Sequence, residues 1–164
     1  MDKKRKSSNL FPYTDAIDTY VLIRRTHDEV HRYVSKQLAQ WGLSVPKYGI
    51  VVHLYDQGSL TLSKLSQLIF SGNSNLTALV DRMERDGIVE RLNSASDRRV
   101  KKIRLTQKGM DLAPKVISEY RGFLHQMMLN CLSPEEQHNL KNLLGQVKNK
   151  ISSLSAPNDT AKQK

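Results

Sequence analysis

Two histidines in the N-terminal part of the chain have a spacing that can bind a metal. His27 and His31 stand four residues apart, so a helix would place both on one face. Zinc proteases use that spacing and need a glutamate directly after the first histidine as general base. Asp28 stands there instead, and no third ligand is evident. We therefore expect partly exposed histidines and no catalytic zinc, with a regulatory metal as the alternative.

The single cysteine, Cys131, limits the redox chemistry of the chain. It cannot form an intramolecular disulfide, and it fits a reducing compartment. It falls on an apolar helical stripe, so we expect it to pack in the core or in a dimer contact. A reactive thiol or an intermolecular bridge is the alternative. No Gly-rich phosphate loop, Ser/His/Asp triad or carboxylate pair stands out, so the sequence predicts neither an enzyme nor a cofactor.

Basic side chains are concentrated between residues 91 and 108, where seven of them occur with one acid, Asp97. The whole chain has a formal net charge of +10. Such an excess indicates a polyanionic partner, and both nucleic acid and an anionic membrane surface meet that description. The seven are Arg91, Arg98, Arg99, Lys101, Lys102, Arg104 and Lys108.

Membrane insertion and export are not expected. No apolar run approaches the roughly 20 residues that a membrane-spanning helix needs, and no apolar signal segment follows the basic N-terminus. The sequence thus predicts a cytoplasmic protein without a membrane partner.

Short polar side chains gather just before an apolar helical pattern, at Asn73, Ser74, Asn75 and Thr77. At a helix N-terminus such side chains suit base edges and phosphate oxygens. Ser and Asn also begin many helices that bind nothing. The basic segment that follows favours nucleic-acid contact.

These residues need elements to position them, and apolar spacings near 3.6 predict helices over most of the chain. Gly42 and Gly87 should end two of them. Two short segments change period and predict an antiparallel hairpin. The expected helices are 17–41, 44–55, a short one from 61, 73–86, 106–131 and one from 133, and the expected strands are 88–92 and 100–105.

Capping residues mark several of these helix starts. Ser44, Thr61 and Thr106 should cap the helices that follow them. Ser133, followed by Pro134 and by Glu136 three residues on, forms the pattern of a capping box.

The order of three helices and a charged hairpin is typical of a winged helix-turn-helix, whose third helix enters the major groove of DNA. We expect a mainly α fold with a small β-hairpin wing, flanked by long dimerisation helices. The expected organisation is a disordered basic tail at 1–11, a single domain at 12–152 and a disordered tail at 153–164. Within the domain, residues 12–42 and 106–152 form the dimerisation helices and 43–105 the DNA-binding unit.

Residues 74–109 resemble the recognition helix and wing of the MarR (multiple antibiotic resistance regulator) family. The family pattern runs Leu-Thr, Val-Asp-Arg, Leu-Glu, Gly-Leu-Val, Asp-Arg-Arg and Leu-Thr-x-x-Gly. The flanking helices extend the resemblance to residues 12–152. The resemblance implies a homodimer joined by its N- and C-terminal helices.

The resemblance also implies roles for individual residues. Asp97 would orient Arg99, which would enter the minor groove, where a narrow groove attracts arginine. Arg98, Lys101 and Lys102 complete the wing residues that we expect to contact DNA. The family often has arginine after Leu-Thr, where this chain has Ala78. Arg82 could substitute for it, or could instead be partly buried against Asp81 or Glu84.

A small, aromatic and anionic effector is a further implication of the resemblance. The family keeps such a pocket between the dimer helices and the DNA-binding unit. The candidate ligand-binding residues are His31, Tyr48, Val52 and His53, with His27 and Val34 nearby in the sequence pattern.

The favoured hypothesis is a sequence-specific, ligand-responsive repressor that binds a pseudo-palindromic operator as a homodimer. An architectural or membrane-surface basic protein would use the same charge without reading sequence. An enzyme is the third class, and it lacks a residue to support it.

Overall fold

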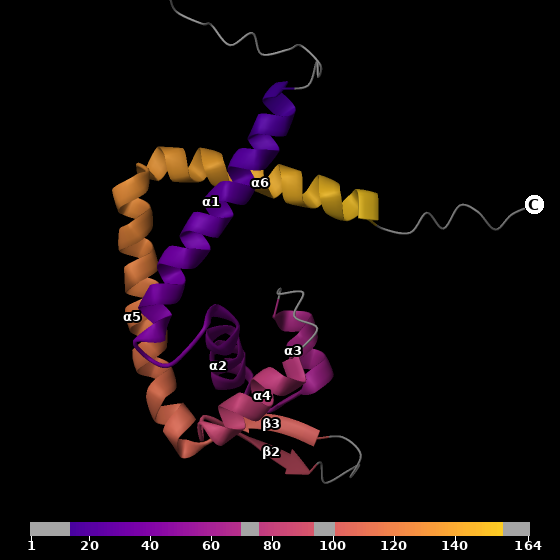
Figure 1. The fold of residues 1–164 in the computed structure, drawn as a ribbon, viewed down its shortest axis with the longest axis vertical. Helices are drawn as coiled ribbons and strands as arrows, with labels where there is room; N and C mark the ends of the chain where they lie inside the picture. The colour runs from indigo at the N-terminus through magenta and orange to yellow at the C-terminus, as the bar shows by residue number, and fades with distance from the viewer. Residues whose placement is uncertain (1–13, 70–75, 94–100, 156–164) are drawn as a thin grey trace, which may run out of the picture. The chain divides into compact units, whose positions relative to one another are not determined.

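The computed structural model describes residues 14–69, 76–93 and 101–155 (Figure 1). These residues form two compact units, of which the first ends at Ile117 and the second begins at Ser118. The elements are α1 (Thr14–Ala39), α2 (Val45–Gln57), β1 (Leu60–Thr61), α3 (Leu62–Leu68), α4 (Leu76–Arg85), β2 (Val89–Asn93), β3 (Lys101–Leu105), α5 (Gln107–Cys131) and α6 (Pro134–Ser155).

The predicted hairpin is part of a three-stranded antiparallel sheet with the order β1-β3-β2. Leu60 pairs with Ile103, and Arg91 pairs with Ile103 from the other side. The sequence analysis missed β1, because two residues carry no readable alternation and Thr61 also begins a helix. The sheet therefore ties α3 to the wing strands through β3.

Alternate residues of β3 point to opposite faces of the sheet, as a strand requires. Ile103 and Leu105 are buried, while Lys102 and Arg104 are exposed. The central strand thus has one face in the core of the first unit and one charged face.

Three of the four predicted caps are confirmed. The hydroxyl of Thr61 accepts the backbone N–H of Lys64 at 3.2 Å. In the capping box, the N–H of Glu136 donates to Ser133 Oγ at 3.3 Å and the N–H of Ser133 donates to Glu136 Oε2 at 2.8 Å. The backbone hydrogen bond from Ser133 lowers the pKa of Glu136 below its ordinary value.

The cap predicted at Ser44 is wrong in its chemistry. Ser44 occupies the N-cap position of α2, but its side chain makes no capping hydrogen bond. Pro46 in the first turn has no N–H to satisfy, so part of the need for a cap is absent. Gly42 lies in the turn between α1 and α2 and has a φ of 67°. The helix α1 ends at Ala39, shortly before this glycine, as predicted.

The core of the first unit is built from α1 to α4, the sheet and the start of α5. Its members are apolar side chains with almost no exposed area, so burial holds the short helices α3 and α4 against the sheet. The largest fully buried side chains are Leu38, Ile50, Val51, Leu54, Leu65, Val80, Met83, Val89, Ile103 and Val116.

The second unit consists of the C-terminal part of α5 and of α6. Gln137 Nε2 donates to the carbonyl oxygens of Leu132 at 2.9 Å and Met128 at 3.3 Å, so it supplies a donor to the carbonyl groups where α5 ends. Cys131 is exposed, so the expectation that it packs in the core is wrong for this chain. It is the last residue of α5, and its packing in a dimer contact stays a prediction.

Large apolar side chains remain exposed on α1 and α6. Of the large apolar side chains of α1, only Val34 and Leu38 are buried. The exposed members include Ile17, Tyr20, Leu22 and Ile23 on α1, and Leu140, Leu143, Leu144, Val147, Ile151 and Leu154 on α6.

The ends of the chain lie partly outside the described residues. Residues 1–13 and 156–164 are not described. The prediction of a tail from residue 153 is wrong for 153–155, because α6 continues through them. None of the described helices combines the length and apolarity required to cross a membrane.

Candidate nucleic-acid interface

The helix α4 has one buried face and one exposed face. Leu79, Val80 and Met83 are buried, whereas Thr77 and Arg82 are exposed. The predicted residues Asn73, Ser74 and Asn75 lie outside the described residues. Of the predicted recognition-helix contacts, the structure therefore describes Thr77 and Arg82, and both face away from the core.

The wing strand β3 presents two exposed lysines, Lys101 and Lys102. Lys102 lies opposite Leu92 of β2 and Thr61 of β1. Within the described ranges, neither lysine is in an ion pair. The predicted residues Asp97, Arg98 and Arg99 lie outside the described residues.

Other basic side chains of the segment 91–108 are engaged within the fold. Arg104 Nε is 2.6 Å from Glu90 Oε1, directly across from it in the sheet. Lys108 Nζ donates to the backbone carbonyl of Asp86 at 2.7 Å, which satisfies an acceptor at the end of α4. The charge count of the sequence therefore overstates the cations that are available to a partner.

Arg91 on β2 forms ion pairs with two carboxylates of α4. Its Nη2 contacts Asp81 Oδ1, its Nη1 contacts Glu84 Oε2, and its backbone N–H donates to Glu84 Oε1 at 3.2 Å. The hydrogen bond to Asp81 raises the pKa of the Arg91 guanidinium, with further contributions from Glu84 and against the effect of desolvation. The alternative that Arg82 is buried against these acids is wrong, because Arg91 occupies that position and Arg82 is exposed.

The C-terminal end of α4 is also attached to α2. Lys47 Nζ of α2 is 2.7 Å from Asp86 Oδ2, and the Lys47 side chain is only 14% exposed. This hydrogen bond lowers the pKa of Asp86 below its ordinary value. Cations from α2, β2 and α5 thus contact the last turns of α4 or the residue that follows it.

Thr106 joins the turn after α4 to the start of α5. Its hydroxyl donates to the carbonyl oxygen of Gly87 at 2.6 Å and accepts the N–H of Gly109 at 3.1 Å, which confirms the predicted cap. A Cβ at Gly109 would overlap the carbonyl oxygen of Ile88. The Leu-Thr-x-x-Gly pattern of the sequence therefore has a geometric cause, since both the hydroxyl and the missing side chain are needed at this junction.

The two histidines of α1 lie on one face, as their spacing predicted. The rings of His27 and His31 stack with centroids 5.8 Å apart, and His27 Nδ1 is 3.3 Å from Asp28 Oδ1. Arg24 also contacts Asp28. In the part of the chain that the structure describes, no three His, Cys, Asp or Glu side chains are grouped as metal ligands.

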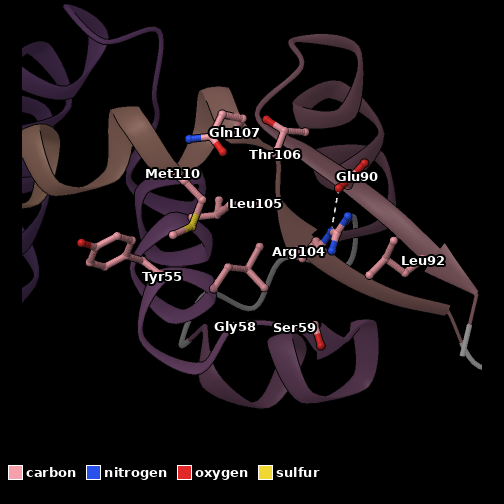
Figure 2. Close-up of a pocket in the computed structure, with 11 residues that line it drawn as sticks. Tyr55, Gly58, Ser59, Glu90, Leu92, Arg104, Leu105, Thr106, Gln107 and Met110 are labelled. Carbon is pink, nitrogen blue, oxygen red and sulfur yellow. Dashed lines mark hydrogen bonds and ion pairs between the residues drawn. The ribbon is translucent and has the colours of Figure 1, made fainter.

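A cavity of about 690 Å³ lies on the face of the sheet that carries Glu90 and Arg104 (Figure 2). Tyr55 of α2 and Met110 of α5 lie at one end of the cavity, and the ion pair between Arg104 and Glu90 lies at the other end. None of the predicted ligand-binding residues lines this cavity. Tyr48, Val52 and His53 are half-buried on α2, and exposed His31 borders a more open depression of about 620 Å³ along α1.

Comparisons with known proteins place this fold in a family. The sequence model of the MarR family matches residues 43–101. The HTH-type transcriptional regulator PecS from Dickeya dadantii is 30% identical over 121 residues, which cover 72% of this chain and 72% of PecS.

Solved structures of MarR-type regulators have the same fold as this chain. A MarR-like transcription regulator from Bacillus cereus superposes with a TM-score of 0.76 at 28% identity, over 84% of this chain and 98% of that chain. A mutant MarR from Escherichia coli in complex with operator DNA has the same fold, with a TM-score of 0.73 at 22% identity over 84% and 98% of the two chains. The winged helix of the first unit, the match to residues 43–101 and the similarity to PecS show that this chain belongs to the MarR family.

Proposed function

We propose that this chain is a sequence-specific, DNA-binding transcriptional repressor that acts in the cytoplasm as a homodimer. The observation that carries the proposal is the distribution of charge on α4 and the wing. The acids Asp81, Glu84 and Asp86 are paired with cations from other elements, while Arg82 and Lys102 remain exposed. A surface with its acids neutralised and its cations free attracts the phosphates of DNA.

Each element has a separate role in this proposal. The N-terminal part of α4, with Thr77 and the preceding polar residues, enters the major groove and contacts base edges. Lys101 and Lys102 of the wing contact phosphates, which position the protein without reading sequence. Arg99, oriented by Asp97, enters the minor groove, as the MarR resemblance implies.

The homodimer is supported by the apolar side chains that the described residues leave exposed on α1 and α6. Exposed apolar area of this extent marks an interaction surface in soluble proteins. A two-fold dimer presents two copies of α4, so it demands an operator with two related half-sites about 34 Å apart.

We extend the proposal to a small aromatic or anionic effector, which rests on the MarR resemblance. His31, Tyr48, Val52 and His53 are the predicted contacts. The cavity of about 690 Å³ beside the sheet, which other residues line, is a second candidate position, because it has the size of a small-molecule site. A ligand that favours a dimer with another spacing of its α4 helices lowers DNA affinity, and hundredfold relief needs about 2.7 kcal/mol of coupling. Titration of phenolic and benzoic acids into the operator complex tests this, and unchanged operator affinity across a broad panel contradicts it.

The DNA-binding proposal is tested with an operator selected by the protein from random-sequence duplexes. Arg99→Ala should weaken operator binding by about 1 to 3 kcal/mol, and Asp97→Ala should act in the same direction. Lys101→Ala or Lys102→Ala should weaken binding to every duplex evenly and lower the salt slope by about one. Footprinting should protect one face of a pseudo-palindrome.

Lys141→Ala is the matched control, because it removes the same charge from an exposed site on α6. It should leave operator affinity unchanged. Equal affinity of the parent protein for the selected and random duplexes would instead favour an architectural basic protein. An Arg99→Ala variant that binds all DNA as tightly as the parent would show that the wing assignment is wrong.

A further inference from the structure

Two carboxylates on α4 need an explanation if this helix lies in the major groove. Asp81 and Glu84 are three residues apart, so they lie on neighbouring positions of one helical face. Both are partly exposed. Unpaired, they would repel phosphates and lower the affinity for every DNA sequence.

Both carboxylates are bound by the same guanidinium. Arg91 reaches Asp81 with one terminal nitrogen and Glu84 with the other, and Glu84 also accepts the Arg91 backbone N–H. Only 24% of the Arg91 side chain is exposed, compared with 52% of the Arg104 side chain in its pair with Glu90, so solvent screens the Arg91 contacts less. The planar guanidinium can bind two separate carboxylates at once, which the single ammonium of lysine does less well.

The contact joins the two elements that are proposed to touch DNA. Arg91 belongs to β2, which pairs with β3 along its whole length, and β3 carries Lys101 and Lys102. On the other side of α4, the buried residues Leu79, Val80 and Met83 hold the helix through packing that has little directional preference. The ion pairs are directional, and they act on the exposed side of the helix.

We propose that Arg91 is a positioning residue that clamps the recognition helix to the wing, so that sequence discrimination depends on the contacts from Arg91 to Asp81 and Glu84. This inference rests on the proposed function. A specific site requires α4 and the wing to meet their grooves in one register, whereas non-specific binding requires only charge near phosphates. The clamp therefore affects the ratio of specific to non-specific affinity more than it affects non-specific affinity itself.

Arg91→Lys separates geometry from charge. The variant keeps the net charge, so its affinity for random duplexes should stay within about twofold of the parent value. Its ratio of specific to non-specific affinity should fall by about tenfold, the order expected when a charge-assisted fork is lost. Affinities are measured by titration of the full-length protein with the selected operator and with random duplexes, at several salt concentrations.

The double variant Asp81→Asn with Glu84→Gln distinguishes the two explanations by the ratio of specific to non-specific affinity. If the acids act only by their charge, removing them should tighten binding to the operator and to random duplexes alike. If they act through the clamp, random duplexes should bind more tightly while the specificity ratio falls. A ratio that stays at the parent value in both this variant and Arg91→Lys overturns the clamp.

Arg104→Gln is the matched control for Arg91→Gln. Each substitution removes one cation from the same sheet, but Arg104 pairs with Glu90 inside the wing and not with α4. Arg104→Gln should weaken binding to the operator and to random duplexes by the same factor. Arg91→Gln should weaken both and should also lower the ratio of specific to non-specific affinity. An equal loss of ratio in both variants contradicts the clamp. A parent protein without discrimination contradicts the proposed function itself, so the two failures are distinguishable.

Discussion

At the scale of single residues, identical residue types have different roles because their surroundings differ. Arg82 lies in the last turn of α4 and is exposed, whereas Arg91, in the following strand β2, binds two carboxylates of α4. Glycines differ in the same way. Gly109 is in close contact with backbone atoms, while a Cβ at Gly122 would meet nothing within 4 Å.

We expect opposite effects of alanine at these two glycines of α5. Gly109→Ala should lower the free energy of unfolding by about 2 kcal/mol or more, because the Cβ would overlap the carbonyl oxygen of Ile88 and displace the junction. Gly122→Ala should raise it by up to about 1 kcal/mol, since alanine is the better helix former. Urea denaturation of both variants measures this, and equal stability of the two would contradict the role of the close approach.

At the scale of elements, polar links attach α4 to its neighbours in addition to the core. Asp86 follows α4 and pairs with Lys47 of α2, while Lys108 of α5 donates to the Asp86 carbonyl oxygen. The hydrogen bond from Lys47 lowers the pKa of Asp86 in the folded protein. Folding and the charge of this carboxylate are therefore linked.

The sign of this link predicts how stability depends on pH. A lowered folded pKa gives stability that is present above the pKa of the unfolded chain, about 3.9 for aspartate, and is lost as the pH falls through the folded value. The parent should therefore be more stable than Asp86→Asn at pH 7, and the difference should shrink in acid. Thermal melts at neutral and acidic pH measure both, and a difference independent of pH would contradict the ion pair.

At the scale of the whole molecule, the described residues leave apolar side chains of α1 and α6 uncovered. Leu143 is 61% exposed and Leu154 is 74% exposed on α6, and Tyr20 is 65% exposed on α1. Large apolar side chains gain free energy when a partner covers them. A second copy of the chain would cover both helices symmetrically.

We therefore expect a stable dimer that depends on α6. Light scattering should report twice the chain mass at micromolar concentration, and removal of residues 133–164 should weaken the dimer. Leu143→Asp should shift the protein toward monomer, because it would bury a carboxylate in the interface. Lys141→Asp, at an exposed polar position of the same helix, should not. A stable monomer of the intact chain would contradict the proposed architecture.

The sequence by itself determined the features that depend on neighbours along the chain. Helical and strand periods predicted the six helices and the two wing strands, and the caps at Thr61, Thr106 and Ser133 were readable because their partners lie within three residues. The tertiary structure alone decided that Leu60 and Thr61 form a third strand, that Arg91 pairs with Asp81 and Glu84, and that the cavity beside the sheet is lined by other residues than those predicted. These contacts join residues that lie farther apart in the chain, and only the packing of helices and sheet brings them within reach.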